Sequence, residues 1–302
     1  LGAAEVNKRF LRAGGFEALL VDSGNRPEEL CTVEELGEIA GVPSREVVRM
    51  ESVAERVAAA GGITAAGYGD AFEAALRDAL HDNVVGLKTV AAYRSTLAID
   101  YAPPGPGEVA RAAGDWLAEV EKSGNARITD SVLERHLIWT GADIAREKGF
   151  PVQFHIGIGD PDIELNKVDP SLLTPFIREA EAWKFPITLL HCYPFHRQAG
   201  LIAENFPYLY FDVGFVQNWV GPSYQRIMDE ALDLAPFTKQ LYSSDAFGLS
   251  ELYYLGSLRF RTSLGRALGR WIDEDELAAG EAERIVDLVG RSNARRIYPL
   301  GV

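Results

Sequence analysis

Two stretches, Val152–Gly157 (VQFHIG) and Ile187–Tyr193 (ITLLHCY), decide the fold that the sequence predicts. Each is a short apolar run that carries one histidine at or near its carboxyl end. His155 and His191 are 36 positions apart (191 − 155), which is about the length of one strand–helix–strand unit. Two successive parallel strands therefore bring both imidazoles to the same edge of a sheet or barrel.

A third apolar run, Gln240–Ala246 (QLYSSDA), contains Asp245 near its end and adds a carboxylate to that edge. Two imidazoles and a carboxylate at the carboxyl ends of parallel strands are typical of a hydrolytic metal site in a β/α barrel. Asp245 alone has a simpler interpretation, because an aspartate that follows a strand commonly caps the next helix. A lone histidine at a strand end is also more often structural than a ligand, so the prediction depends on all three residues together.

The apolar runs predict seven strands, each followed by a helix. Such strict alternation indicates a parallel sheet with helical crossovers, and near-continuous apolar strands indicate burial on both faces. We therefore predict an α/β fold, a (β/α)8 TIM barrel whose first strand is missing from the chain shown. Residues 1–302 are expected to form a single barrel domain with a helical insertion at about residues 100–148. The predicted strands are Phe16–Asp22, Glu46–Glu51, Val84–Val90, Val152–Gly157, Ile187–Tyr193, Leu209–Val213 and Leu241–Asp245.

Composition excludes several classes of partner. The 302 residues carry a formal net charge of −14, which argues against binding to nucleic acid or to an anionic membrane. The two cysteines, Cys31 and Cys192, have no paired zinc or redox spacing, so we expect a reducing, cytoplasmic compartment. No apolar run reaches the roughly 18 residues that a membrane span needs, and we recognise no secretory signal.

Five segments together resemble the metal-dependent amidohydrolase superfamily. The closer resemblance is to its amidohydrolase-2 branch, which includes the amidohydrolase domain found with glutamine-synthetase-like proteins. It covers roughly residues 16–300 and implies an eight-stranded barrel with the metal at the carboxyl ends of the strands. The segments are VVGLKTVAAYRSTL (84–97), VQFHIGIGD (152–160), ITLLHCYPFHRQAG (187–200), LYFDVG (209–214) and LYSSDA (241–246).

The resemblance implies roles for four residues. His155, His191 and Asp245 match metal ligands, and Asp245 also matches the catalytic base that takes a proton from the metal-activated water. His191 is a ligand in two-metal members of the family, whereas in one-metal members it polarises the substrate or orients the water. Lys88 matches the position of a carboxylated lysine that bridges two metals. The implied cofactor is a divalent metal, Zn²⁺ before manganese or iron, with one or two ions.

Lys88 has two further interpretations. A lysine inside an apolar strand such as VVGLKTV is rarely buried without a partner, so an ion pair with Glu51 or Asp22 is one alternative. Its ammonium group is also suited to binding a substrate carboxylate. The sequence leaves these alternatives open.

Three more residues are predicted to bind substrate. Tyr93 and Arg94 follow Lys88 at the same edge, and the planar guanidinium of an arginine can hold a carboxylate through two hydrogen bonds. A structural salt bridge is the alternative for Arg94. His196 lies five positions after His191 in a loop that contains a proline, and we expect it at the mouth of the pocket.

The sequence departs from the family pattern at one point. The first strand of the family usually carries two histidines one residue apart, and no such pair occurs here. The chain shown either lacks its natural amino-terminal segment, as its start at Leu1 suggests, or the protein has lost that strand and its tight metal binding. The five histidines are His81, His136, His155, His191 and His196.

The sequence thus predicts a metal-dependent hydrolase that cleaves a C–N or C–O bond in a small polar substrate. One alternative is a metal-dependent decarboxylase of the same branch, like the aminocarboxymuconate semialdehyde decarboxylases. Another is a non-catalytic barrel domain that assists a glutamine-synthetase-like partner. We expect a small-molecule substrate and a homo-oligomer, with no nucleic acid and no membrane.

Overall fold

A curved, all-parallel sheet forms the centre of the protein. The structure is a computed structural model that describes residues 2–24, 29–159, 161 and 163–301. The strands are β1 (Leu19–Asp22), β2 (Ser44–Arg49), β3 (Val84–Thr89), β4 (Val152–His155), β5 (Ile187–Leu190) and β6 (Leu209–Phe211). They lie side by side in sequence order, and every neighbouring pair is parallel. The structure therefore confirms the predicted parallel α/β fold.

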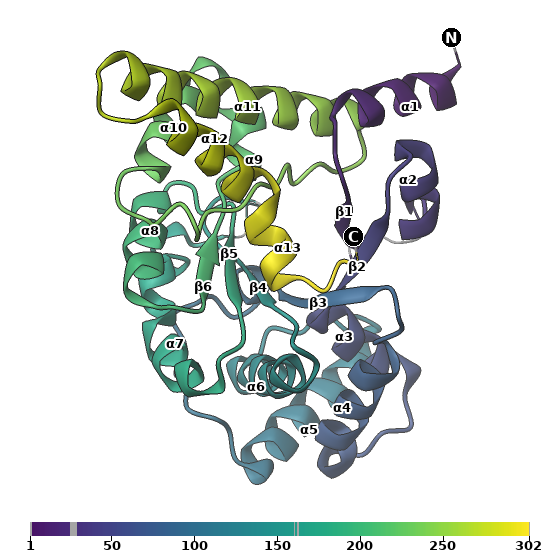
Figure 1. Cartoon of the computed structure of the whole chain (residues 1–302). Helices are drawn as coiled ribbons and strands as arrows, with labels where there is room; N and C mark the ends of the chain where they lie inside the picture. The colour runs from purple at the N-terminus through teal and green to yellow at the C-terminus, as the bar shows by residue number, and fades with distance from the viewer. Residues whose placement is uncertain (1, 25–28, 160, 162, 302) are drawn as a thin grey trace.

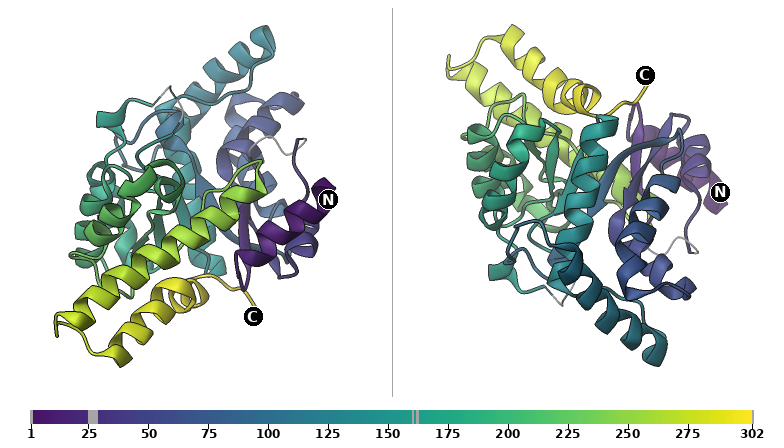
Figure 2. Two further views of the ribbon diagram at one scale, coloured as in Figure 1. Left: turned by 90° about the horizontal axis from the view of Figure 1, so that it is seen from above. Right: turned by 90° about the horizontal axis from the view of Figure 1, so that it is seen from below.

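Helices cover the outside of the sheet and one of its ends, as Figure 1 shows. In chain order the α-helices are α1 (Ala3–Ala13), α2 (Val33–Ala40), α3 (Met50–Ala60), α4 (Tyr68–Asp78), α5 (Pro106–Ser123), α6 (Ser131–Lys148), α7 (Thr174–Ala180), α8 (His196–Asn205), α9 (Gly214–Trp219), α10 (Tyr224–Ala231), α11 (Ser250–Asp273), α12 (Ala279–Asp287) and α13 (Asn293–Ile297). α6 packs against β3 and β4, and α8 packs against β6. α1 contacts α11, and Figure 2 shows these two helices crossing the same end of the molecule. The region of the predicted helical insertion, residues 100–148, contains α5 and α6.

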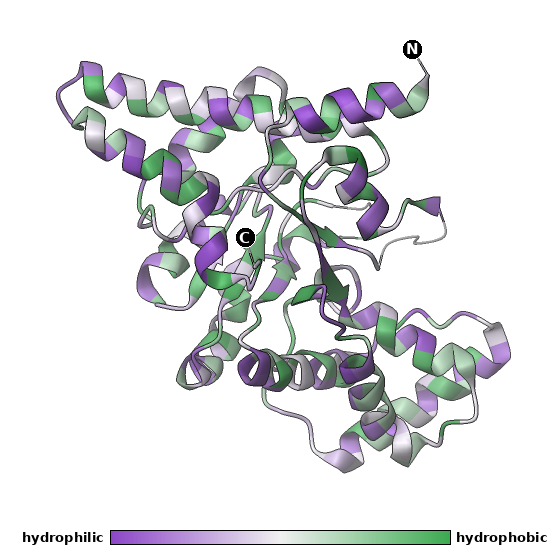
Figure 3. Ribbon diagram, turned by 45° about the vertical axis from the view of Figure 1, so that its right-hand side comes forward, coloured by the Kyte–Doolittle hydropathy of each residue, from purple (hydrophilic) through white to green (hydrophobic). Residues whose placement is uncertain are grey.

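The two faces of β4 serve different purposes. Phe154 is completely buried and its ring lies 5.4 Å from that of Phe176 on α7. The neighbouring Gln153 and His155 line a cavity on the inner face. Side chains alternate along a strand, so an apolar outer face anchors the strand while its inner face presents polar groups. In Figure 3 the strands are mainly hydrophobic, whereas the helices mix both classes.

Two predicted strands end differently from expectation. The run Glu46–Glu51 was expected to be extended throughout, but β2 ends at Arg49 and α3 begins at Met50, so Glu51 lies in a helix. The run Leu241–Asp245 was expected to be a regular strand, but it makes no ladder. Only the parallel bridge between Phe211 and Gln240 joins this region to β6. The positive φ of Asp245, 46°, is incompatible with an extended strand.

The sheet is open on one side. Within the described residues β1 pairs only with β2, and the β-bridge of Gln240 is made only with Phe211 of β6. Both edges line the same cavity of about 1460 Å³. Tyr298 near the carboxyl terminus fills part of the interior, where its hydroxyl oxygen accepts a 2.8 Å hydrogen bond from Gln153 Nε2. The polar groups described next lie in the part of this cavity beyond the carboxyl ends of the strands.

Candidate metal and active site

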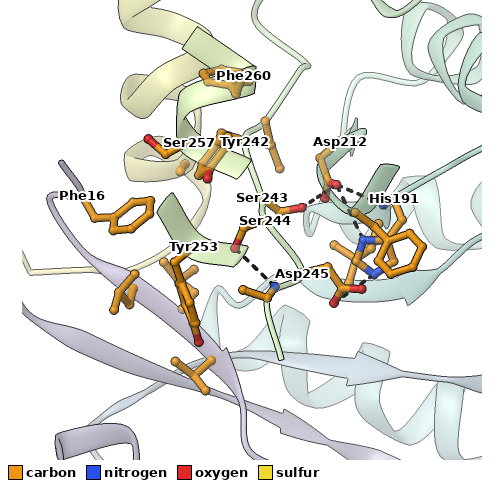
Figure 4. A pocket seen from close by; sticks show the side chains of 18 of the residues that line it. Phe16, His191, Asp212, Tyr242, Ser243, Ser244, Asp245, Tyr253, Ser257 and Phe260 are labelled. Carbon is orange, nitrogen blue, oxygen red and sulfur yellow. Dashed lines mark hydrogen bonds and ion pairs between the residues drawn. The ribbon is translucent and has the colours of Figure 1, made fainter. Parts of the chain in front are cut away.

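Asp212 fixes the backbone around His191. The backbone N–H of His191 donates to Asp212 Oδ1 over 3.0 Å, and the N–H of Gly214 donates to the same oxygen over 2.9 Å. The hydroxyl of Ser243 donates to it over 2.6 Å, as Figure 4 shows. Asp212 therefore ties together the end of β5, the start of α9 and the segment that carries Asp245.

The three residues that the sequence singled out lie together. The ring centroids of His155 and His191 are 4.9 Å apart, and His191 Nε2 lies 3.6 Å from Asp245 Oδ1. His191 and Asp245 have positive φ angles of 70° and 46°, which non-glycine residues seldom adopt. Such strain costs about 1–3 kcal/mol for each residue and persists only where the surrounding structure holds it, often at a functional site.

Both imidazoles are held in the neutral form. Burial lowers the pKa of His155 and of His191 well below the ordinary value, and the charge of Lys88 lowers both further. Among the described residues, neither ring nitrogen of His191 has a hydrogen-bond partner, although the side chain is 3% exposed. Its distances to Asp245 (3.6 Å) and to Asp212 (3.9 Å) are too long for hydrogen bonds. A buried imidazole with unused nitrogens costs stability unless something else binds it.

Tyr93 lies against His155. Its hydroxyl oxygen is 2.7 Å from His155 Nε2, and the two ring centroids are 4.3 Å apart. The carbonyl oxygen of Ile158 lies 3.1 Å from the same nitrogen. The sequence predicted a substrate-binding role for Tyr93, and the structure places its hydroxyl on a candidate metal ligand.

Lys88 forms an ion pair with Asp22, one of the alternatives that the sequence left open. Lys88 Nζ lies 2.9 Å from Asp22 Oδ2 and Arg49 Nη2 lies 2.5 Å from the same oxygen. The two cations lower the pKa of Asp22 despite its burial. Arg49 and Lys88 are register partners on β2 and β3. The bridging-ligand role of Lys88 stays a prediction, since here its ammonium group is bound to a carboxylate.

The other two predicted substrate-binding residues differ in position. Arg94 lines the cavity, and its Nη2 lies 3.1 Å from Glu55 Oε1 while its buried Nε has no partner. His196 does not line the cavity. It begins α8, where its Nε2 lies 2.6 Å from Glu230 Oε2 on α10. The positions of these two residues thus suit a substrate contact for Arg94 and a helix–helix link for His196.

The donor atoms fit a divalent metal ion in chemistry, although they do not already surround one. Neutral imidazole and carboxylate are the ligands that zinc takes in catalytic sites, and His191 has two nitrogens without partners. Within the described ranges, however, no three histidine, cysteine, aspartate or glutamate side chains are grouped closely enough to hold an ion. His155, His191 and Asp245 therefore supply suitable donor atoms beyond the carboxyl ends of the strands, without being arranged around one common point.

Sequence reasoning missed Arg49 as a residue of this site. A signal was present, because Asp22, Arg49, Lys88 and His155 each lie at the carboxyl end of one of four successive strands, β1 to β4. In a parallel sheet such positions share one edge.

Burial raises the pKa of Asp212 to about 6 even though its oxygen accepts three hydrogen bonds, so this buried acceptor titrates above the ordinary range.

Comparison with known proteins is consistent with this geometry. The family model described as amidohydrolase matches residues 37–300. Protein fluG of Emericella nidulans is 28% identical over 239 residues, which are 76% of this chain but 27% of that protein. The chain thus spans about a quarter of the length of this curated relative.

Two solved structures show the same architecture. A protein of Lactobacillus casei ATCC 334, assigned as a metal-dependent hydrolase, superposes with a TM-score of 0.90 at 28% identity, over 99% of this chain and 77% of that one. A uronate isomerase of Thermotoga maritima has a TM-score of 0.69 at 14% identity, over 96% of this chain and 69% of that one. The second likeness concerns the fold alone.

Among the described helices, none has the length and apolar character needed to traverse a bilayer.

Proposed function

The chain belongs to the amidohydrolase family, and on that premise we propose that it is a metal-dependent hydrolase of a small polar substrate, cleaving a C–N or C–O bond. One observation carries the proposal: two neutral, buried imidazoles and a carboxylate converge at the edge of a large cavity. The resemblance to the Lactobacillus casei protein, which is assigned as a metal-dependent hydrolase, supports the same chemistry.

His155, His191 and Asp245 would hold the metal, which we expect to be zinc. When bound, such an ion polarises the scissile bond and lowers the pKa of a water molecule to about 7.

Four side chains of the protein would have separate roles in the reaction. Asp245 is 34% exposed at its side chain, so it can take the proton of the attacking water and return it to the leaving group. Asp212 holds the backbone of His191 in place, and Tyr93 orients His155. Arg94, with an unused buried Nε, positions an anionic or carbonyl group of the substrate.

The test is product analysis on the purified chain with added zinc and a panel of small amides, esters and lactones. We expect an acid with an amine or alcohol as products, and a loss of about 10²–10⁴-fold in kcat for Asp245→Asn, the range for removing a general base. Asp233→Asn, on an exposed aspartate, is the matched control and should retain full activity. Release of carbon dioxide would identify the decarboxylase instead, and no turnover with no metal uptake would indicate a non-catalytic barrel.

A further inference from the structure

Five rings form a continuous series from the candidate metal site towards the surface. The ring centroids of Tyr93 and His155 are 4.3 Å apart, and those of His155 and His191 are 4.9 Å apart. Phe215 follows at 5.9 Å from His191, and Trp219 at 5.6 Å from Phe215. The last pair is stacked, with an angle of 29° between the rings. The three spacings from His155 to Trp219 lie within the usual range of favourable aromatic contacts, and that between Tyr93 and His155 is slightly shorter.

The outer end of this series is unusually exposed for large apolar side chains. Trp219 is 65% exposed, Leu249 58% and Phe247 43%, and all three line the same cavity as His191. The carbonyl oxygens of Ser244 and Leu252 accept hydrogen bonds from Asn218 Nδ2, so the end of α9 lies beside the segment that carries Phe247 and Leu249. Single exposed apolar residues are ordinary, whereas a group of them at a cavity marks a binding surface.

The chemistry of the lining selects one class of ligand. The part of the cavity formed by α9 and residues 246–252 is lined only by apolar side chains, namely Phe215, Trp219, Ala246, Phe247, Leu249 and Leu252. The side chains there offer no hydrogen bond to the hydroxyl groups of a sugar stacked on Trp219, so a sugar gains no polar contact beyond those it already makes with water. A flat apolar ring gains dispersion and quadrupole contacts without that cost.

We propose that the substrate carries an aryl group that stacks on Trp219 and Phe215, while its hydrolysable bond reaches His191 and Asp245. Trp219 is then the residue that selects aromatic substrates. This inference rests on the proposed function for the reacting end of the molecule, but the aryl contact itself needs neither metal nor turnover.

Binding of benzamide to the full chain tests the proposal, with cyclohexanecarboxamide as its saturated counterpart. Isothermal titration without added metal should give a lower Kd for benzamide than for cyclohexanecarboxamide. Trp219→Leu keeps an apolar side chain but removes the flat ring. It should raise the Kd of benzamide about fivefold, which corresponds to the usual free energy of one aromatic contact. Trp219→Phe should restore part of the affinity, and Leu234→Ala, on an exposed leucine that does not line the cavity, should change nothing.

Several outcomes would overturn the proposal. In one, the wild type fails to bind benzamide, or binds cyclohexanecarboxamide or methyl β-D-glucoside at least as tightly as benzamide. In another, the Kd of benzamide for Trp219→Leu equals that for the wild type. A change in oligomeric state of that variant at constant Kd would instead make the patch a protein contact. Because Trp219 is largely exposed, the thermal midpoint of Trp219→Leu should match the wild type. Aryl binding by a chain that hydrolyses no member of the substrate panel with added zinc would refute the proposed function and leave the aryl contact standing.

Discussion

Carboxyl side chains with little exposure lie on opposite faces of β3, Asp22 on one face and Glu51 with Glu134 on the other, and their pKa values are shifted in opposite directions. Asp22 lies on the cavity side with Lys88, where its pKa is lowered. Glu51 and Glu134 lie on the helical side, next to Thr89, and both are completely buried with a raised pKa. Lys88 and Thr89 are consecutive in the strand, so their side chains point to opposite faces.

Different partners explain the difference. Asp22 is paired with two cations, which outweigh the effect of burial. On the helical side burial dominates, and the carboxyl of Glu51 raises the pKa of Glu134 further. Glu51 Oε1 accepts from the hydroxyl of Thr89 over 2.5 Å and from the N–H of Val90 over 2.7 Å. The comparison shows that the surroundings favour the charged carboxylate on the cavity face of β3 and disfavour it on the face that packs against the helices.

The largest expected effect comes from breaking the cavity-side network. Asp22→Asn leaves Lys88 and Arg49 buried without their counter-ion, and the free energy of unfolding at pH 7 should fall by about 3–5 kcal/mol. Because the folded pKa of Asp22 is lowered, its stabilisation is present above the unfolded value and is lost as pH falls through the folded one. The deficit of the variant should therefore shrink in strong acid. Urea unfolding at several pH values measures it, and a loss below about 1 kcal/mol at pH 7 would show that the pairing is weak.

A smaller effect of opposite sign is expected on the helical side. In the part of the chain that the structure describes, no group donates a hydrogen bond to either oxygen of Glu134. Because its folded pKa is raised, stability is lost as pH rises from the unfolded value towards the folded one. Glu134→Gln cannot ionise and supplies an amide donor for Glu51, so it should be more stable than wild type at pH 8 by about 1–2 kcal/mol. The gain should vanish near pH 4.

Glu119→Gln is the control for that prediction, because it makes the same chemical change on a side chain that is 61% exposed in α5. Its urea midpoint should follow the wild type at every pH. A stability difference for Glu134→Gln that does not change between pH 4 and pH 8 would contradict the raised pKa.

The smallest effect on stability is expected at a carboxylate away from both faces of β3. Glu230 is 25% exposed and bound to His196 between α10 and α8. His196→Gln keeps a donor for Glu230, so the free energy of unfolding should change by less than about 1 kcal/mol. Zinc uptake and turnover should be unaffected, since His196 does not line the cavity. A selective loss of turnover at normal stability would return His196 to the substrate site.

The part of the fold that depends on local pattern could be predicted from the sequence. Apolar runs that end in a histidine located β4 and β5, and the spacing of the runs placed His155 and His191 on one edge. The third run was harder to predict, because Asp245 lies in an irregular segment held by hydrogen bonds to Asp212 rather than by a ladder. The prediction that Asp245 lies near His191 depended on the family resemblance as much as on the pattern of apolar runs.

What could not be predicted depends on contacts between distant segments. The choice of Asp22 rather than Glu51 as the partner of Lys88 follows from β2 ending at Arg49, two residues before Glu51. His196 follows His191 closely, but the start of α8 turns it towards Glu230. In both cases, moving the boundary of a helix by one or two residues changes the side of the sheet or helix on which the side chain lies.

Zinc titration of the purified chain tests the central claim, that His155, His191 and Asp245 form one metal site, most directly. The comparison is with the double variant His155→Gln/His191→Asn, in which asparagine suits the positive φ at position 191, and with His81→Gln at an exposed histidine. We predict one or two zinc ions per chain for the wild type and for His81→Gln, and at least about tenfold weaker binding for the double variant. Less than about 0.3 zinc per wild-type chain, or equal binding by the double variant, would contradict the account.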